Sequence, residues 1–211
     1  MICPRKEGVM KKIYLNFLFA ILAFFSFTVH AEQSAEKVLD AIVEIRISVP
    51  ENARTAERFG TNRVASGVVI DKTGHILTIG FQTIEAETIE IVGQDHKTVT
   101  ATVVAYDRNT GFGLLRATSP LQVTPMPLGS SSEIKEGDPV LAASYGSKDA
   151  VQGVRVVARK EFAGPWEYLL ENAILQPLRL IDSAVPRLLI AMAISLASGI
   201  YSLSLGLQIW D

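Results

Sequence analysis

The stretch from Ser66 to Ala117 decides the fold and reads SGVVIDKTGHILTIGFQTIEAETIEIVGQDHKTVTATVVAYDRNTGFGLLRA. Apolar runs of strand length alternate in it with short turn sequences. The segment Asp71-Lys72-Thr73-Gly74 ends one run with a glycine, which supplies the positive φ that a tight hairpin needs, and Gly93 to His96 is a second such turn. Strand-length runs repeating about every dozen residues between turns predict an antiparallel all-β sandwich or barrel.

The residues just before this stretch extend the same pattern. Residues 41–49 alternate from Val43 onward, which predicts a strand with one wet face that ends at Pro50. The charged segment 51–63 is interpreted as an exposed loop. We therefore expect a first barrel over roughly 41–117. Its inward-facing residues are predicted to include Val68, Ile70, Leu77, Ile91, Val103 and Leu115.

Three segments of this stretch carry a family resemblance: 68–71, 74–78 and 106–115. In their order and spacing they resemble the first barrel of HtrA-type trypsin-like serine proteases, which read SGVIID-x-x-G-x-ILTNNHVV and later D-x-x-T-D-L-A-L-L. A weaker similarity continues through 136–140 and 152–154, so the resemblance covers about half of the chain. It implies an all-β, trypsin-like antiparallel double β-barrel. We expect the first barrel to be complete and the second to be incomplete.

The catalytic residues of that family do not carry over to this sequence. The family histidine lies three residues after the Thr of ILT, and that position, the histidine slot, holds Phe81 here. The family aspartate follows the Thr of D-x-x-T, and that position, the aspartate slot, holds Gly111. No Gly-Asn-Ser-Gly-Gly or Gly-Asp-Ser-Gly-Gly segment follows. A triad needs a base and a carboxylate that orients it, so the resemblance implies the fold and argues against the activity.

Residues 1–31 are interpreted as a signal peptide. A lysine pair precedes the apolar run from Ile13 to Phe27, and small residues lead to a predicted cleavage between Ala31 and Glu32. Met10 would be a natural start for such a peptide. We expect an exported protein, periplasmic or secreted, and the alternative is an N-terminal anchor.

Composition and residue spacing argue against several kinds of binding site. A net charge of -2 without clustered Lys and Arg argues against nucleic-acid binding. The single cysteine, Cys3, lies in the predicted signal peptide and has no partner for an internal disulfide. No spacing of His, Cys, Asp and Glu suggests a metal site, and we expect no cofactor. His75 and His96 are interpreted as solvated turn histidines without a carboxylate partner.

The second half is predicted to hold a linker at 119–127, which contains three prolines, and a partial second barrel at 128–174. Expected strands lie at 139–145, 153–162 and 166–174, the last of which could also be a short helix.

The tail at 175–211 does not continue the family pattern. Its segment 188–210 is uncharged and about as long as a membrane-spanning helix, so a C-terminal apolar helix that anchors the chain is one interpretation. The other is translation out of frame after about Ile174, because the displaced codons permit a strand–turn–strand pattern. The nucleotide sequence of the gene would decide between them.

Three functions are consistent with these observations. An inactive trypsin-like module would at most bind unfolded or peptide ligands, and we favour it because of Phe81 and Gly111. An active HtrA-type serine endopeptidase and a periplasmic β domain anchored through 188–210 are the alternatives. The sequence fixes neither a ligand nor an oligomeric state.

Overall fold

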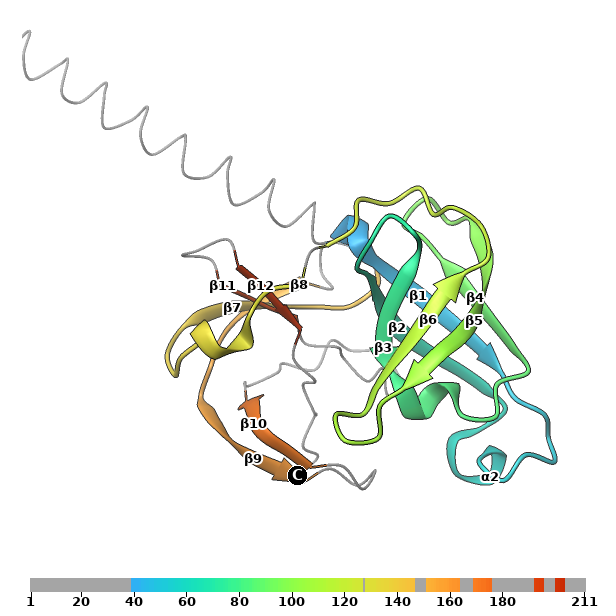
Figure 1. The fold of residues 1–211 in the computed structure, drawn as a ribbon, viewed down its shortest axis with the longest axis horizontal. Helices are drawn as coiled ribbons and strands as arrows, with labels where there is room; N and C mark the ends of the chain where they lie inside the picture. The colour runs from blue at the N-terminus through green and yellow to red at the C-terminus, as the bar shows by residue number, and fades with distance from the viewer. Residues whose placement is uncertain are drawn as a thin grey trace, which may run out of the picture. The chain divides into compact units, whose positions relative to one another are not determined.

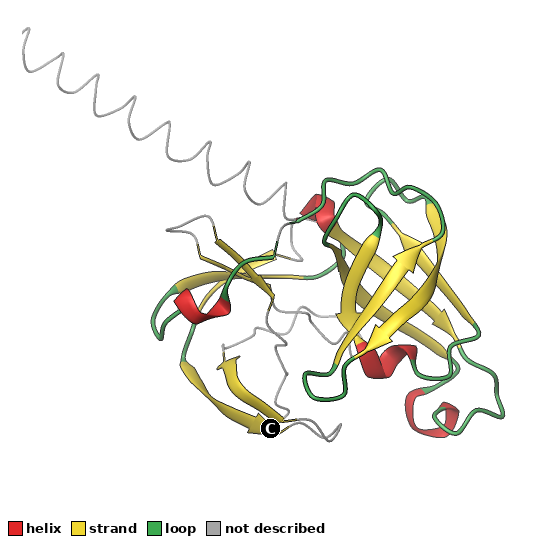
Figure 2. Ribbon diagram, viewed as in Figure 1, coloured by secondary structure: helices red, strands yellow, loops and turns green. Residues whose placement is uncertain are grey.

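The computed structural model describes residues 39–126, 128–146, 151–163, 169–175, 192–195 and 200–203. Most of these residues lie in β-strands, with a few short helical turns between them (Figure 2). The part that forms the first barrel, 39–126, is continuous.

Six strands close into the first barrel in the order β1-β2-β3-β6-β5-β4, with antiparallel neighbours throughout (Figure 1). This confirms the antiparallel barrel predicted from the turn-bounded runs. The strands are β1 (Ile42–Ser48), β2 (Asn62–Val69), β3 (His75–Ile79), β4 (Thr88–Val92), β5 (Thr98–Tyr106) and β6 (Phe112–Ala117). Two helical turns interrupt the connections: α2 (Ala56–Phe59) and the 3-10 turn η1 (Gly80–Thr83).

The hairpin between β2 and β3 forms as its sequence predicts. Gly74 has a φ of 83°, a conformation that residues with a side chain rarely adopt. The amide of Gly74 donates to the carbonyl of Asp71, and the amide of Ile70 donates to the carbonyl of His75. The turn therefore sets the pairing of β2 with β3.

The barrel interior is filled mainly by valine and isoleucine side chains, with three alanines and one leucine. Of the six residues predicted to face inward, Ile91 and Leu115 are fully buried in this core. The other four predictions are wrong. Val68, Ile70 and Leu77 fail because the inward residues of β2 and β3 are their neighbours Val69 and Ile76, whereas Val103 is exposed beside a bulge in β5. Successive strand residues point to opposite faces, so an error of one residue exchanges the two faces. The interior residues are Val43, Ile45, Ile47, Val49, Ala65, Val69, Ile76, Ile89, Ile91, Ala101, Leu115 and Ala117.

The four misassigned residues have distinct surroundings. Val68 is buried and Ile70 half-buried outside the barrel, where they pack in a cluster with Met126 and Ala143. Leu77 is half-buried, whereas Val103 is 46% exposed next to a β-bulge in β5. Val68 and Ile70 are apolar because they pack with residues of the second half, which the sequence pattern alone does not distinguish from packing in the barrel core.

The second half contains the turn η2 (Ser131–Glu133) and two separate antiparallel strand pairs. β7 (Pro139–Ala143) pairs with β8 (Val151–Arg155), and β9 (Ala158–Ala163) pairs with β10 (Leu169–Leu175). The single strand expected at 153–162 is therefore wrong, since Val156 and Val157 separate two strands. Among the described residues these pairs do not close a barrel, as expected for an incomplete second barrel.

Hydrogen bonds and apolar packing join the second half to the first barrel. The amide of Met126 donates to the carbonyl of Val69, and that of Tyr145 donates to the Ser66 hydroxyl. Leu141, Ala143, Tyr145 and Val151 pack with Ala41, Ile42 and Val68 on the outside of the barrel. A smaller cluster of Ile134, Val140, Val156 and Ile174 lies within the second half itself.

The tail contains strands where the sequence suggested an apolar helix. β11 (Met192–Ser195) pairs with β12 (Ile200–Leu203) in antiparallel register, so the helix expected over 188–210 is wrong at these residues. The rest of that span lies outside the described residues, as does the predicted signal peptide. Within the described ranges, no helix has the length and apolar character needed to cross a membrane.

Candidate functional site

The histidine slot is a buried aromatic position. Phe81 lies on η1, directly after β3, and is 5% exposed. Its ring centroid is 5.2 Å from that of Phe59 on α2, with the rings tilted by 48°. Ile79, Ile84, Phe112 and Leu170 complete the apolar cluster around it. The catalytic histidine of the family exchanges protons in an open cleft. At the same position, Phe81 instead fills an apolar core.

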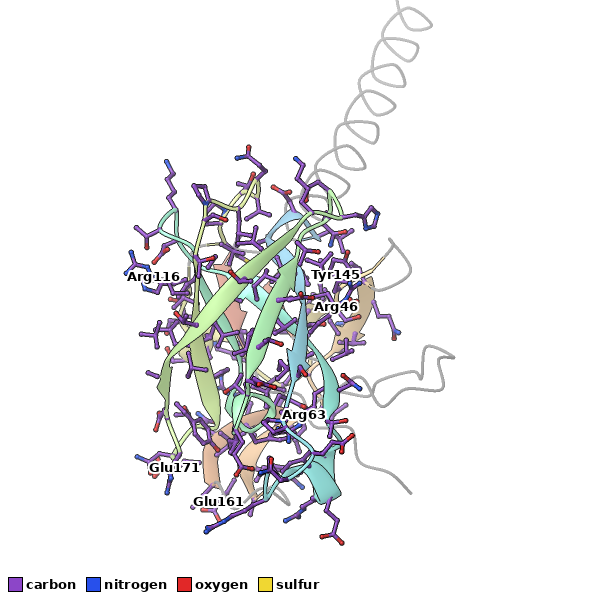
Figure 3. The ribbon with its side chains drawn as sticks, turned by 90° about the vertical axis from the view of Figure 1, so that its right-hand side faces the viewer. Arg46, Arg63, Arg116, Tyr145, Glu161 and Glu171 are labelled. Atoms are coloured by element: carbon purple, nitrogen blue, oxygen red, sulfur yellow. The ribbon has the colours of Figure 1, made fainter. Side chains whose placement is uncertain are left out.

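Arg63, which is labelled in Figure 3, donates hydrogen bonds that hold the backbone around this slot in place. Its guanidinium donates to the carbonyls of Gln82 and Ile84 at 3.1 and 3.0 Å, and to the Thr55 hydroxyl at 2.7 Å. Burial lowers the pKa of Arg63. The residue is 3% exposed, so the interpretation of 51–63 as an exposed loop is wrong at its end. Nothing near Arg63 in the sequence indicates this role, because the carbonyls that it binds lie about twenty residues away.

Glu85 extends the network from the other side. Its carboxylate accepts hydrogen bonds from the Thr55 hydroxyl, at 2.7 Å, and from the amides of Thr55 and Arg54. These bonds lower the pKa of Glu85, and the bond from the Thr55 hydroxyl contributes most. The backbone of Glu85 has a φ of 60°, which is uncommon for a residue with a side chain. The loop before β2 is therefore tied to the turn that carries Phe81.

The aspartate slot lies next to the histidine slot. The amide of Gly80 donates to the carbonyl of Gly111 at 2.8 Å, which places the residue before Phe81 against the slot. Gly111 has a φ of 77° and closes the turn that begins at Asp107. The structure thus brings together the two positions that the sequence singled out, one occupied by Phe and the other by Gly.

Polar groups close to the two slots in the chain form hydrogen bonds within their own turns. The carboxylate of Asp107 accepts from the amide of Asn109 and the hydroxyl of Thr110, and the hydroxyl contributes most to lowering the pKa of Asp107. The Thr83 hydroxyl donates to the carbonyl of Gly80 at 2.7 Å and is buried. These groups stabilise turns, and none of them forms a base–carboxylate pair at the slots.

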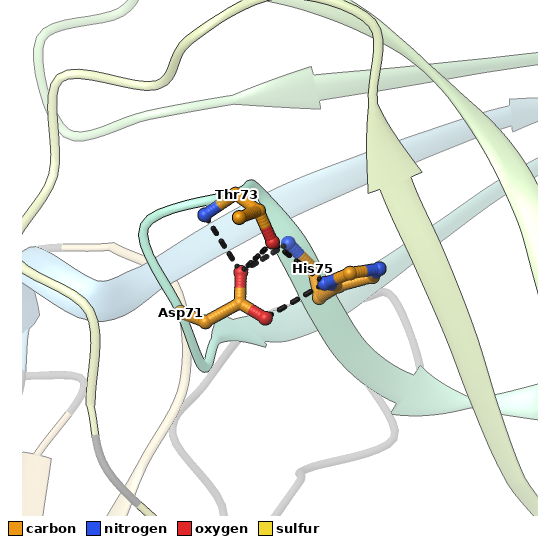
Figure 4. Close-up of polar contacts among 3 residues, drawn as sticks. All are labelled: Asp71, Thr73 and His75. Carbon is orange, nitrogen blue, oxygen red and sulfur yellow. Dashed lines mark hydrogen bonds and ion pairs between the residues drawn. The ribbon is translucent and has the colours of Figure 1, made fainter.

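His75 has a carboxylate partner, contrary to the prediction (Figure 4). Its Nδ1 lies 2.7 Å from Oδ2 of Asp71 and 2.9 Å from the hydroxyl of Thr73. Oδ1 of Asp71 accepts the Thr73 hydroxyl and the amides of Thr73 and His75. These bonds, led by the Thr73 hydroxyl, hold the pKa of Asp71 well below its usual range.

This arrangement does not amount to a catalytic dyad with its nucleophile. In a serine triad the carboxylate and the hydroxyl contact opposite ring nitrogens of the histidine. Here Asp71 and Thr73 both face Nδ1 of His75, and the Thr73 hydroxyl also bonds Asp71. The three residues instead close the hairpin between β2 and β3.

His96 is an exposed turn residue, as predicted. Its φ is 60° and its amide donates to the carbonyl of Gly93. Its Nδ1 lies 3.4 Å from the hydroxyl of Tyr145, which donates to the carbonyl of Gly93 at 3.2 Å. Burial raises the pKa of Tyr145.

Within the described ranges, no three His, Cys, Asp or Glu side chains gather as metal ligands would. A pocket of about 320 Å³ lies beside the β2–β3 hairpin, away from the two slots. Its lining residues are Val69, Asp71, Lys72, Gly74, Leu121, Val123, Thr124 and Pro125.

Comparison with known proteins agrees with this architecture. The family described as "Trypsin-like peptidase domain" matches residues 65–182, more than half of the chain. A curated relative, "Serine protease HtrA-like" from Staphylococcus haemolyticus (strain JCSC1435), is 32% identical over 118 residues, which are 52% of this chain and 18% of that protein.

A solved structure, "HtrA-type protease AlgWS227A with tripeptide", has the same fold with a TM-score of 0.53 and 20% identity. The alignment covers 64% of this chain and 42% of that one, so this chain spans less than half of either relative. Fold, family match and motif order agree, and the chain belongs to the family of trypsin-like peptidase domains, with an HtrA-type resemblance.

Proposed function

We propose that this chain is an exported, catalytically inactive trypsin-like protein that binds extended peptides without cleaving them. The observation that carries the proposal is the buried Phe81 in the histidine slot, with Gly111 beside it in the aspartate slot. Neither side chain can accept the proton of a serine or orient a base that does so. A serine hydroxyl without a neighbouring base is a weak nucleophile.

The sequence supplies the third argument for inactivity. The family's nucleophile segment does not occur anywhere in these 211 residues. Restoring the first two positions by Phe81→His and Gly111→Asp would therefore leave the triad without its serine. The restored side chains would also be poorly accommodated, because position 81 lies in an apolar cluster and position 111 has a positive φ.

Peptide binding is proposed from the fold, and export from the N-terminal sequence. The solved HtrA-type relative is "HtrA-type protease AlgWS227A with tripeptide", so that protein holds a peptide. The lysine pair, the apolar run 13–27 and the small residues before Glu32 support export, to the periplasm or to the medium. Cell fractionation with detection of the processed N-terminus tests that part separately.

Proteolysis assays test the proposal. The purified full chain, the Phe81→His/Gly111→Asp double variant and the conservative control Phe81→Leu are incubated with casein and with fluorogenic peptides. We expect no turnover from any of the three, while an active HtrA-type protease cleaves both substrates. Turnover that a serine-directed inhibitor abolishes would overturn the proposal.

Binding is measured on the same preparations by the fluorescence anisotropy of a labelled, unfolded casein fragment. A rise in anisotropy without cleavage is the expected result. If neither binding nor cleavage occurs, the peptide-binding part of the proposal is wrong and the inactivity stands.

The alternative function is an active HtrA-type serine endopeptidase, which the likeness to the curated "Serine protease HtrA-like" favours. The same cleavage assay distinguishes the two functions.

A further inference from the structure

We draw no further inference here: the strongest candidate, the pocket of about 320 Å³ between the β2–β3 hairpin and the linker at 121–125, is lined by the oppositely charged Asp71 and Lys72 beside apolar side chains, and nothing in the structure shows what would fill it.

Discussion

The first barrel and the second half of the chain differ in whether their strands close into a barrel. In the barrel, β1 to β6 close on themselves around one apolar core. Among the described residues of the second half, β7–β8 and β9–β10 are two-stranded pairs, with the small cluster around Val140 and Ile174. A closed sheet has no edges along most of its length, whereas a two-stranded sheet is marginal unless it packs on something else. The barrel therefore supplies its own stability, and the second half depends on contacts with it.

The largest predicted difference between the two regions is in how the loss of a buried side chain affects the stability of the barrel. Ile91→Ala should lower the free energy of unfolding of the barrel by about 3 kcal/mol, because Ile91 is fully buried there. Ile174→Ala, buried in the second half, should leave the barrel amides almost unaffected. Hydrogen exchange under increasing urea measures both. Equal loss of protection in the barrel with either variant would show that the two regions unfold as one unit.

A smaller loss is expected from a glycine of the barrel. A Cβ on Gly80 would lie 2.1 and 2.3 Å from two ring carbons of Tyr106, so Gly80→Ala should cost about 2 kcal/mol through displacement of that ring. The matched change in the second half is Gly153→Ala, where nothing lies within 4 Å of the added carbon. Thermal unfolding followed by circular dichroism gives the comparison. A Gly80→Ala protein as stable as the wild type would show that the ring moves at no cost.

Disrupting the hydrogen-bond network around Phe81 should lower the free energy of unfolding by a similar amount, but the structural effect should be more local. Arg63→Met removes the donors to the carbonyls of Gln82 and Ile84 and should cost about 1–3 kcal/mol. The control is Arg116→Met, on an exposed position of β6. Limited proteolysis should show faster cleavage between 80 and 86 in the first variant alone. Unchanged cleavage would mean that the loop does not need Arg63.

The smallest effect concerns pH. The pKa of Asp71 is lower in the folded chain than in the unfolded one, so its contribution to stability is present above pH 4 or so and is lost as pH falls toward the folded pKa. Asp71→Asn keeps the shape but not the charge. Because the carboxylate is 41% exposed, solvent screens it, and we expect the wild type to be more stable by under about 1 kcal/mol at pH 7. The difference should shrink between pH 5 and pH 2 in urea titrations. A difference that grows on acidification would contradict the assignment.

The turns and the family positions could be predicted from the sequence because both depend on local signals. Gly74 marks its hairpin, and the spacing from Thr78 and Thr110 locates Phe81 and Gly111, which the structure places side by side. The faces of the strands could not be predicted in the same way. Val68 and Val69 are both apolar, since the second half covers the outside of β2 while the core occupies the inside.

The two remaining errors have different causes. Arg63 is buried where it donates to carbonyls of a turn that lies far away in the sequence. Nothing near Arg63 in the sequence distinguishes it from an exposed loop residue. The contact of His75 with Asp71 was missed for a different reason: the hairpin folds back so that residues four apart meet, a geometry that needs the turn itself.

The central claim is that the histidine and aspartate slots are filled by residues that cannot activate a serine. Its most direct test is treatment of the purified full chain with a fluorophosphonate, followed by measurement of the intact mass. We predict no added mass, while an active HtrA-type protease treated in parallel gains one label per chain. Stoichiometric labelling of any serine in this chain would contradict the claim.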